Sequence, residues 1–352
     1  MLRFRLINAS HDGSFVKAPV KFGAVALIAV VAITTLAALR PGFTFPILRD
    51  GGVASLEQIT LNGAPQWILI RGQRNKPIVL FLHGGPGMPS MYLAHAFQRP
   101  LESDFLIVHW DRRGAGKSYS TSTNPALVRT SQEVSDATAL ITALLERYGQ
   151  HRAIVVGHSY GSYLGIALTT QHPELVRAYV GVGQVSCDPD TEAAIQDRWL
   201  RQQATGAGDR TTIKMIGLPK WDRESALFRY GAEVTTWTSV APMIVTGLAS
   251  PEYSIADAMN VRKGVEFTHR NFVYDGPSRP LSQSVRALQT PLYLFEGRRD
   301  YVAPTLCAAQ LFEEITAPRK VWIWFDKSAH FPFLEEPDKF HRELLAVASA
   351  NP

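Results

Sequence analysis

The chain has 352 residues, of which 46% are hydrophobic and 19% are charged, and its formal net charge is +5 at pH 7. This composition excludes a disordered chain, and the length is sufficient for one large domain with an insertion. No block of lysine and arginine alternates with aromatic residues, so we expect no nucleic-acid partner. The two cysteines form no C-x-x-C motif, so we expect neither a zinc site nor a dithiol redox centre.

The N-terminal part differs from the rest of the chain. Residues 1–21 form a basic leader, and residues 22–39 form an uncharged apolar run that Arg40 follows. As a helix this run would span about 27 Å, close to the hydrocarbon thickness of a bilayer. Because more basic residues precede the run than follow it, we predict a single-pass membrane anchor with a cytoplasmic N-terminus and the remaining chain on the extracytoplasmic side. A cleaved signal peptide, which would give a secreted protein, is the alternative.

From about residue 45 onward, short apolar segments alternate with helical ones. Residues 56–61 and 66–70 predict a hairpin, because Asn62-Gly63 suits a two-residue turn. Residues 77–82 are continuously apolar, as expected for a strand that is buried on both faces. This alternation predicts an α/β fold with a mostly parallel sheet covered by helices.

A glycine-rich loop, His83-Gly84-Gly85-Pro86-Gly87, follows the strand at 77–82. Glycines leave backbone N–H groups unobstructed, so such a loop can donate a hydrogen bond to the oxyanion of a tetrahedral intermediate. Of the two candidates, Gly84 and Gly85, we favour Gly85 as the donor. We expect His83 to brace the loop by hydrogen bonding rather than to transfer protons.

Residues 105–110 predict the next strand, which leads into Asp111-Arg112-Arg113-Gly114-Ala115-Gly116-Lys117-Ser118. The end of this loop is similar to a phosphate-binding loop. That motif requires glycine where Asp111 stands, and the carboxylate would repel phosphate, so we expect no nucleotide site. We predict instead that Asp111 and Arg112 support the site through hydrogen bonds. A helix is predicted over 134–148 from its apolar spacing.

The most informative motif is Gly157-His158-Ser159-Tyr160-Gly161, which lies between the apolar run 153–156 and a helical segment that ends at His172-Pro173. A strand, a sharp turn with serine at its tip and a helix form a nucleophile elbow. Side chains two positions either side of the serine would clash, which explains the two glycines. We predict Ser159 as the nucleophile and the N–H of Tyr160 as the second oxyanion donor.

Three further strands are predicted at 176–185, 291–296 and 320–325. Asp300 follows the second of them and His330 follows the third, so both lie at the strand ends where Ser159 also lies. In the chain order serine, acid, histidine, we predict His330 as the general base and Asp300 as the group that orients it. Asp326 is the rival acid, but it lies too near its strand to be oriented freely.

Residues 188–289 interrupt the alternation with helical patches and no β-α-β unit, and we interpret them as an insertion over the sheet. Cys187 and Cys307 are far apart in sequence, and we favour two ordinary thiols, with a disulfide as the alternative. We expect structural roles for three histidines, His109, His158 and His269. The predicted organisation is a leader (1–21), an anchor (22–39), a first core part (45–187), a helical insertion (188–289) and a second core part (290–352).

Together, the loops at 83–87 and 111–118, the serine elbow and the loops of Asp300 and His330 resemble the proline iminopeptidase family of α/β-hydrolases. The resemblance covers the chain from about residue 45 to its end and implies an α/β-hydrolase fold with a helical cap. It also implies release of N-terminal residues, typically proline, from short peptides. Tyr160 departs from the family, which often has tryptophan there. Family caps carry acidic residues that hold the free amine of the substrate, and the available ones here are Glu224, Glu233 and Glu252.

We therefore predict a serine hydrolase, an aminopeptidase that cleaves small peptides through an acyl-enzyme and needs no metal or organic cofactor. A carboxylesterase acting on small acyl esters is the alternative, because H-G-G-P-G is shared with esterases of the same fold. A non-catalytic binding protein is a third hypothesis, against which the intact serine, acid and histidine positions argue. The sequence leaves the oligomeric state open.

Overall fold

The computed structural model describes residues 25, 28 and 41–351. The leader predicted for 1–21 and all but two residues of the anchor predicted for 22–39 lie outside the described residues. Within the described part of the chain, no helix combines the length and the apolar character needed to cross a membrane. The residues from Gly42 onward form one unit, which holds all the strands of the structure.

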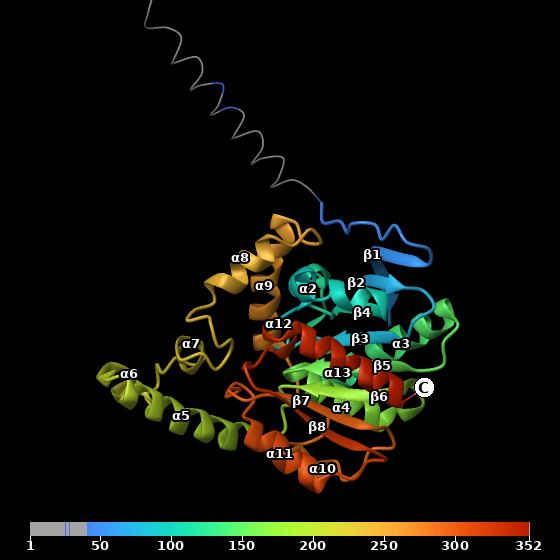
Figure 1. The fold of residues 1–352 in the computed structure, drawn as a ribbon. Coiled ribbons are helices and arrows are strands. Elements are labelled where there is room, and N and C mark those ends of the chain that lie inside the picture. The colour runs from blue at the N-terminus through green and yellow to red at the C-terminus, as the bar shows by residue number, and fades with distance from the viewer. Residues whose placement is uncertain (1–24, 26–27, 29–40, 352) are drawn as a thin grey trace, which may run out of the picture. The chain divides into compact units, whose positions relative to one another are not determined.

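An eight-stranded sheet forms the centre of this unit, in the order β1-β2-β4-β3-β5-β6-β7-β8 (Figure 1). The pairs β1–β2 and β2–β4 are antiparallel, and every other neighbouring pair is parallel. The mostly parallel sheet predicted from the sequence is therefore confirmed. The strands are β1 (Gly52–Leu61), β2 (Ala64–Gln73), β3 (Ile78–Leu82), β4 (Leu106–Asp111), β5 (Ala153–His158), β6 (Val176–Val182), β7 (Leu292–Gly297) and β8 (Lys320–Phe325).

The β1–β2 hairpin lies at the antiparallel edge of the sheet. Leu61 pairs with Ala64 across the predicted two-residue turn. Both turn residues have positive φ, 46° at Asn62 and 76° at Gly63, the backbone geometry that matches the twist of the flanking strands. Both strands are longer than predicted, because backbone pairing continues where the apolar alternation has stopped.

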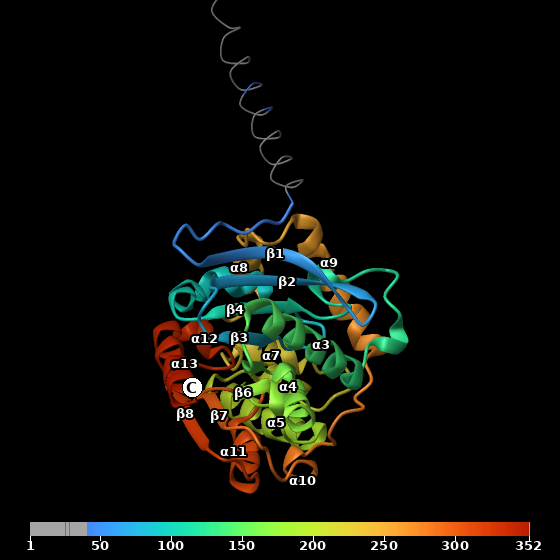
Figure 2. The same cartoon turned by 90° about the vertical axis from the view of Figure 1, so that its right-hand side faces the viewer.

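Helices cover both faces of the sheet (Figures 1 and 2). Leu164 of α4 packs in the same apolar cluster as Leu80 of β3. Phe340 of α13 packs instead with Phe81, because successive strand residues point to opposite faces. The core helices are α2 (Ala94–Phe97), α3 (Thr130–Tyr148), α4 (Tyr160–Gln171), α11 (Thr305–Glu314), α12 (Pro332–Glu335) and α13 (Pro337–Ala350), with short 3-10 helices η1 (Met91–Leu93), η2 (Arg99–Ser103), η3 (Gly116–Ser118), η4 (Pro125–Leu127) and η5 (Pro173–Leu175).

Between β6 and β7 the described chain forms helices and adds no strand to the sheet. We call residues 188–289 the cap and propose that they form a layer distinct from the core. Part of the cap has its own small apolar cluster, which includes Trp199, Leu200 and Leu227. The helices of this segment are α5 (Pro189–Gly206), α6 (Arg210–Met215), α7 (Arg223–Arg229), α8 (Ala241–Leu248), α9 (Ile255–Asn271) and α10 (Leu281–Ser284).

Polar contacts tie the connection between α8 and α9 to the core. The ammonium of Lys117 is 2.6 Å from Oδ2 of Asp257 and also donates to the carbonyl oxygen of Glu252, at 3.1 Å. The hydroxyl of Thr44 donates to the carboxylate of Glu252, at 3.1 Å. The cap is therefore fixed to the body of the unit at the connection between α8 and α9 and at the start of α9.

A disulfide joins Cys187 to Cys307, so the expectation of two ordinary thiols is wrong. The cysteines are 120 residues apart in sequence, so the sequence alone does not indicate that they are close in the fold. Cys187 follows β6 and Cys307 lies in α11, which follows β7, and these two strands are neighbours in the sheet. The bridge fixes the beginning of the cap to the core.

Removing this bridge should destabilise the protein. The disulfide closes a loop of 120 residues, so replacing both cysteines with serine should lower the free energy of unfolding by about 2–5 kcal/mol. Urea denaturation followed by circular dichroism measures the change. The wild type in dithiothreitol should match the double variant, and the variant itself should not respond to the reductant. Equal stability of oxidised and reduced wild type would contradict the disulfide.

Candidate active site

The nucleophile elbow lies between β5 and α4. Ser159 joins them with φ 54° and ψ −127°, a conformation that residues with side chains rarely adopt. A Cβ atom at Gly157 would lie 2.4 Å from the carbonyl oxygen of Gly161, and one at Gly161 would lie 2.0 Å from that of Leu82. Close approach of the backbone therefore demands both glycines, for the reason predicted from the motif.

Asp300 and His330 come from the loops after β7 and β8 and are both buried. Nδ1 of His330 is 2.8 Å from Oδ2 of Asp300. The other carboxylate oxygen accepts hydrogen bonds from the N–H groups of Val302 and Ala303, each at 2.9 Å. These bonds fix the carboxylate, which can hold the proton of His330 on Nδ1 and leave Nε2 available as a base.

A glycine that sequence reasoning missed packs against this pair. Gly183 follows β6 with φ +55°, and a Cβ atom there would lie 2.7 Å from Nδ1 of His330 and 2.9 Å from Oδ2 of Asp300. Only glycine leaves room for the two side chains to meet. Its turn also explains why β6 ends at Val182 and not at residue 185 as predicted. A glycine directly after a parallel strand is the signal that could have found it.

The environment of His330 raises the pKa of its imidazole above the ordinary value of 6.5. Burial alone lowers this pKa, but the negative charge of Asp300 and its hydrogen bond outweigh burial, and the carboxylates of Glu233 and Glu192 act in the same direction. His330 is therefore a stronger base than a free histidine.

Arg112, which is fully buried, supports the glycine-rich loop as predicted. Its guanidinium donates to the carbonyl oxygens of His83, at 2.6 Å, and of Gly84, at 3.0 Å, and to Oε1 of Glu133 in α3, at 3.1 Å. In a planar trans peptide the N–H points opposite to the carbonyl. The N–H groups of Gly84 and Gly85 therefore point away from Arg112.

His83 braces the same loop, as expected. Its Nε2 accepts a hydrogen bond from the backbone N–H of Arg112, at 3.2 Å, and its Nδ1 is 3.0 Å from the carbonyl oxygen of Gly84. Burial, followed by the charge of Arg112, holds the pKa of His83 well below its ordinary value. A neutral imidazole with one donor and one acceptor satisfies both contacts.

Tyr160, the other predicted oxyanion donor, is the first residue of α4. Its hydroxyl donates to Oε2 of Glu133, at 2.9 Å, and the guanidinium carbon of Arg112 lies 5.1 Å from the centroid of its ring. The tyrosine thus completes the coordination of the buried carboxylate of Glu133, whose other oxygen binds Arg112.

The loop at 111–118 is committed to structural contacts. Oδ2 of Asp111 accepts hydrogen bonds from the N–H of Lys117, at 2.8 Å, and from the hydroxyl of Tyr253 in the cap. The side chain of Lys117 is paired with Asp257 of α9. Because its lysine and carboxylate are engaged in this way, the loop lacks the free cation of a phosphate-binding loop.

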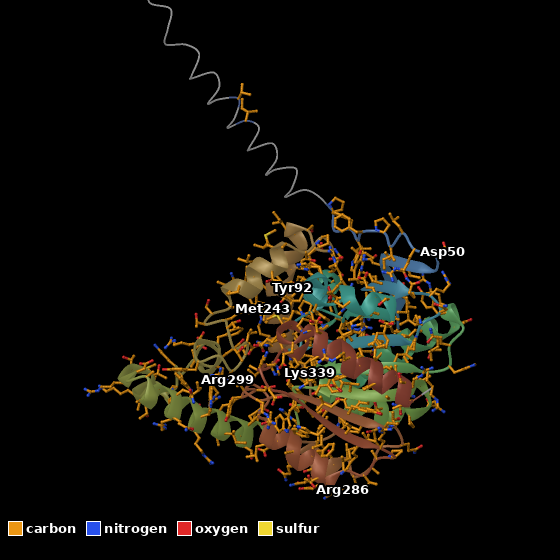
Figure 3. All side chains as sticks on the ribbon, viewed as in Figure 1. Asp50, Tyr92, Met243, Arg286, Arg299 and Lys339 are labelled. Carbon is orange, nitrogen blue, oxygen red and sulfur yellow. A yellow bond between two sulfur atoms is a disulfide. The ribbon has the colours of Figure 1, made fainter. Side chains whose placement is uncertain are left out.

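A cavity of about 270 Å³ opens beside Ser159 and His330. Gly84 and Gly85 line it from the core, and most of its other walls are apolar side chains of the core and the cap. Tyr92 and Met243 are two of these side chains and are labelled in Figure 3. A small substrate would therefore meet a mainly apolar surface next to the serine.

Two of the three acidic cap residues singled out from the sequence, Glu224 and Glu233, line this cavity. Burial raises the pKa of Glu233 to about 7, and the neighbouring charges of Asp300 and Glu224 act in the same direction, whereas His330 opposes them. Glu252 lies elsewhere, and its carboxylate accepts hydrogen bonds from Thr44 and Ser250.

A second cavity, of about 220 Å³, is also lined by Ser159 and was not foreseen. Gly85 and Tyr160 line it from the core, and Glu192 of α5 and Arg279 add charged groups from the cap. Glu192 and Arg279 are far apart in sequence, and neither belongs to a motif.

The remaining candidates lie outside the proton-transfer pair. Asp326, the rival acid, is exposed and pairs with Arg298, at 2.8 Å. His158 is 2.8 Å through Nε2 from the backbone carbonyl oxygen of His330, so it has the structural contact expected of it. His109 stacks on Phe81 in the core. For His269 we expected only a structural role, but this residue lines the first cavity.

The chain is similar in sequence to a probable aminopeptidase and in fold to a proline iminopeptidase. A curated relative, the "Probable aminopeptidase YbaC" of Bacillus subtilis strain 168, is 28% identical over 304 residues, which cover 83% of this chain and 95% of the relative. The crystal structure of a proline iminopeptidase of Mycobacterium smegmatis matches with a TM-score of 0.61 at 17% identity and covers 84% of this chain and 98% of its own.

An esterase, RhEst1 of Rhodococcus sp. ECU1013, matches in structure with a TM-score of 0.56 at 21% identity and covers 85% of this chain and 100% of its own. The two structural matches show a shared fold, in which peptidases and esterases both occur. The model of the alpha/beta hydrolase family matches residues 79–343, most of the chain. The chain belongs to the alpha/beta hydrolase family.

Proposed function

We propose that this hydrolase is a serine aminopeptidase that releases the N-terminal residue of short peptides. The convergence of Ser159 and His330 on one cavity, with Asp300 bound to His330, is the observation that carries the proposal. The similarity to a probable aminopeptidase along 95% of the length of that relative supports this reaction class.

In the proposed reaction, the hydroxyl oxygen of Ser159 attacks the carbonyl carbon of the first peptide bond, and Nε2 of His330 takes the hydroxyl proton. The N–H groups of Gly85 and Tyr160 bind the resulting oxyanion. His330 then gives its proton to the leaving nitrogen as the C–N bond breaks. Water, activated by His330, hydrolyses the acyl-enzyme and returns the serine to its starting state.

Recognition of the free amine fits the acidic side of the first cavity. Glu233 lies close enough to His330 for their charges to influence each other, and Glu224 lies at the exposed rim. A protonated substrate amine would offset the cost of ionising the partly buried Glu233 carboxylate. We propose that these two residues hold the amine, as caps of the proline iminopeptidase family do.

The second candidate function is a carboxylesterase. It is favoured by the apolar walls of the first cavity and by the fold shared with the esterase RhEst1. An ester substrate would use the same nucleophile and base but would make no use of Glu224 and Glu233.

An assay of amide against ester separates the two functions. L-Proline p-nitroanilide and p-nitrophenyl acetate are compared by kcat/KM, with Ser159→Ala as the blank for both. The aminopeptidase proposal expects efficient, serine-dependent cleavage of the anilide, and N-acetylation of its proline should abolish cleavage because the amine charge is lost. Cleavage of the ester alone would favour the esterase.

The pH dependence should differ between these substrates. His330 must be neutral to accept a proton, so kcat/KM for both should fall as the pH falls through its raised pKa, above 6.5. Glu233 must be ionised to hold an amine, so the anilide should lose additional activity as the pH falls through about 7. The anilide profile should therefore be steeper than the ester profile on the acid side.

The variant Glu233→Gln should remove this additional pH dependence and lower kcat/KM for the anilide more than for the ester. Glu266→Gln is the matched control. Glu266 is an exposed cap glutamate, and its one salt bridge in the described chain is with its helix neighbour Arg262. Parallel acid limbs for the two substrates in the wild type would contradict the assignment of Glu233.

We also propose that the unit from Gly42 onward works in an extracytoplasmic compartment, attached by an anchor at 22–39. The support is the apolar run itself and the disulfide, since such bonds form and persist in oxidising compartments. A protease added to intact cells should degrade a reporter fused to the C-terminus, and the protein should remain in the membrane fraction. A protected reporter would contradict the topology, and release into the medium would favour the cleaved signal peptide.

A further inference from the structure

The second cavity beside Ser159 is lined by Arg279, a largely covered arginine with few polar contacts. Only 18% of the Arg279 side chain is exposed, and its charged neighbour in the described chain is Glu192, with Nη1 3.5 Å from Oε2. Within the same residues its guanidinium donates no hydrogen bond. By contrast, the buried side chains of Arg71 and Arg113 each donate several hydrogen bonds, to a carboxylate and to a backbone carbonyl.

The backbone on the N-terminal side of Arg279 is held firmly. The hydroxyl of Tyr163 in α4 donates to the carbonyl oxygen of Pro277, at 2.7 Å, and Asp275 accepts two hydrogen bonds from Ser131 of α3. The guanidinium carbon of Arg279 lies 5.7 Å from the centroid of the Tyr274 ring. A guanidinium with unused donors is thus presented to the cavity from a fixed segment, a state that favours binding because little freedom remains to be lost.

We propose that Arg279 binds the C-terminal carboxylate of the leaving group, so that the preferred substrates are very short peptides, dipeptides above all. The inference rests on the proposed aminopeptidase function. If Glu224 and Glu233 hold the amine in the first cavity, the acyl residue occupies that cavity. Ser159 also lines the second cavity, which can take the part of the substrate beyond the scissile bond.

The size and charge of the two cavities fit such a substrate. The second cavity, at about 220 Å³, has the liquid volume of only about seven water molecules, enough for a small leaving residue. The first cavity carries two carboxylates, the second carries Arg279 with its partner Glu192, and Ser159 lines both. A dipeptide has the complementary arrangement, with a positive amine at one end, a carboxylate at the other and one peptide bond in the middle.

A substrate carboxylate can bind Arg279 only if it replaces Glu192 as the partner of the guanidinium. Glu192 occupies the position next to Arg279 and would compete with a substrate carboxylate for the guanidinium. Burial raises the pKa of Glu192 to about 7, although Arg279 and His330 act against the rise. Near neutral pH, Glu192 can therefore take up a proton and give Arg279 to the substrate without leaving two carboxylates beside each other.

The test compares L-prolyl-L-leucine with L-prolyl-L-leucinamide, which have nearly the same shape and differ in the C-terminal charge. Hydrogen bonds to charged groups typically contribute enough for a preference of about ten-fold or more in kcat/KM. We expect the wild type to prefer the dipeptide by this factor. The ratio should fall to about one in Arg279→Gln, whereas Arg279→Lys should retain part of it. Glu192→Gln, which removes the competing carboxylate, should increase the preference.

Arg286→Gln is the matched control. Arg286 also lies 3.5 Å from a glutamate, Glu314, but 66% of its side chain is exposed (Figure 3). This variant should keep the wild-type ratio, and thermal melting should verify that each variant is folded. Because the ratio compares two substrates of one enzyme, partial loss of folded protein cancels from it.

The outcomes distinguish this inference from the proposed function. A wild type that cleaves proline p-nitroanilide but hydrolyses the dipeptide and its amide equally well would overturn the role of Arg279 and leave the aminopeptidase proposal intact. A ratio that persists in Arg279→Gln would also overturn it. A wild type that cleaves neither the anilide nor either peptide would overturn the proposed function and the inference with it.

Discussion

The buried guanidinium of Arg112 is the interaction on which the site depends. A charge without contact to water must be paired and hydrogen-bonded, or the folded state becomes costly. Here Glu133 supplies the opposite charge, and the carbonyl oxygens of His83 and Gly84 complete the contacts. The need to satisfy one buried charge therefore sets the shape of the glycine-rich loop. Breaking such a pair typically costs about 3–5 kcal/mol, so the loop has little freedom to adopt another conformation.

The same carboxylate links this loop to the elbow. Glu133 binds Arg112 with one oxygen and the hydroxyl of Tyr160 with the other. Tyr160 is the first residue after Ser159, so the two groups proposed to donate to the oxyanion are connected through one side chain of α3. This arrangement gives a reason for tyrosine at a position where the resembling family often has tryptophan. The tyrosine hydroxyl meets a buried acceptor that would otherwise lack a partner.

The features that sequence reasoning predicted are local ones. The elbow can be recognised because a strand, a strained serine and two glycines occur within a few residues, and the contacts of Gly157 and Gly161 follow from that turn alone. Asp300 and His330 could be selected because each follows a predicted strand in a parallel sheet. The residues that sequence reasoning missed depend on contacts between distant segments. Gly183 is constrained by side chains more than a hundred residues away, and Glu192 meets Arg279 only through the fold of the cap.

The prediction of two free thiols failed for the same reason. The two cysteines are brought together by the pairing of β6 with β7 in the sheet, which their spacing in the sequence does not reveal. The extents of β1 and β6 show a different limit. An apolar pattern reports burial, whereas a strand ends where backbone pairing ends. Pairing extends β1 beyond its apolar pattern, and the turn at Gly183 stops β6 before the end of its pattern.

The attachment of the cap has a consequence for what can reach the serine. The disulfide fixes its first residues, and the contacts of Lys117 and Thr44 fix the connection between α8 and α9. A covering layer pinned at separated points has little scope to swing open as a hinged lid. We therefore expect the cap to select substrates by size. It would exclude extended or folded polypeptides from the serine, and only molecules small enough to diffuse past it would be hydrolysed.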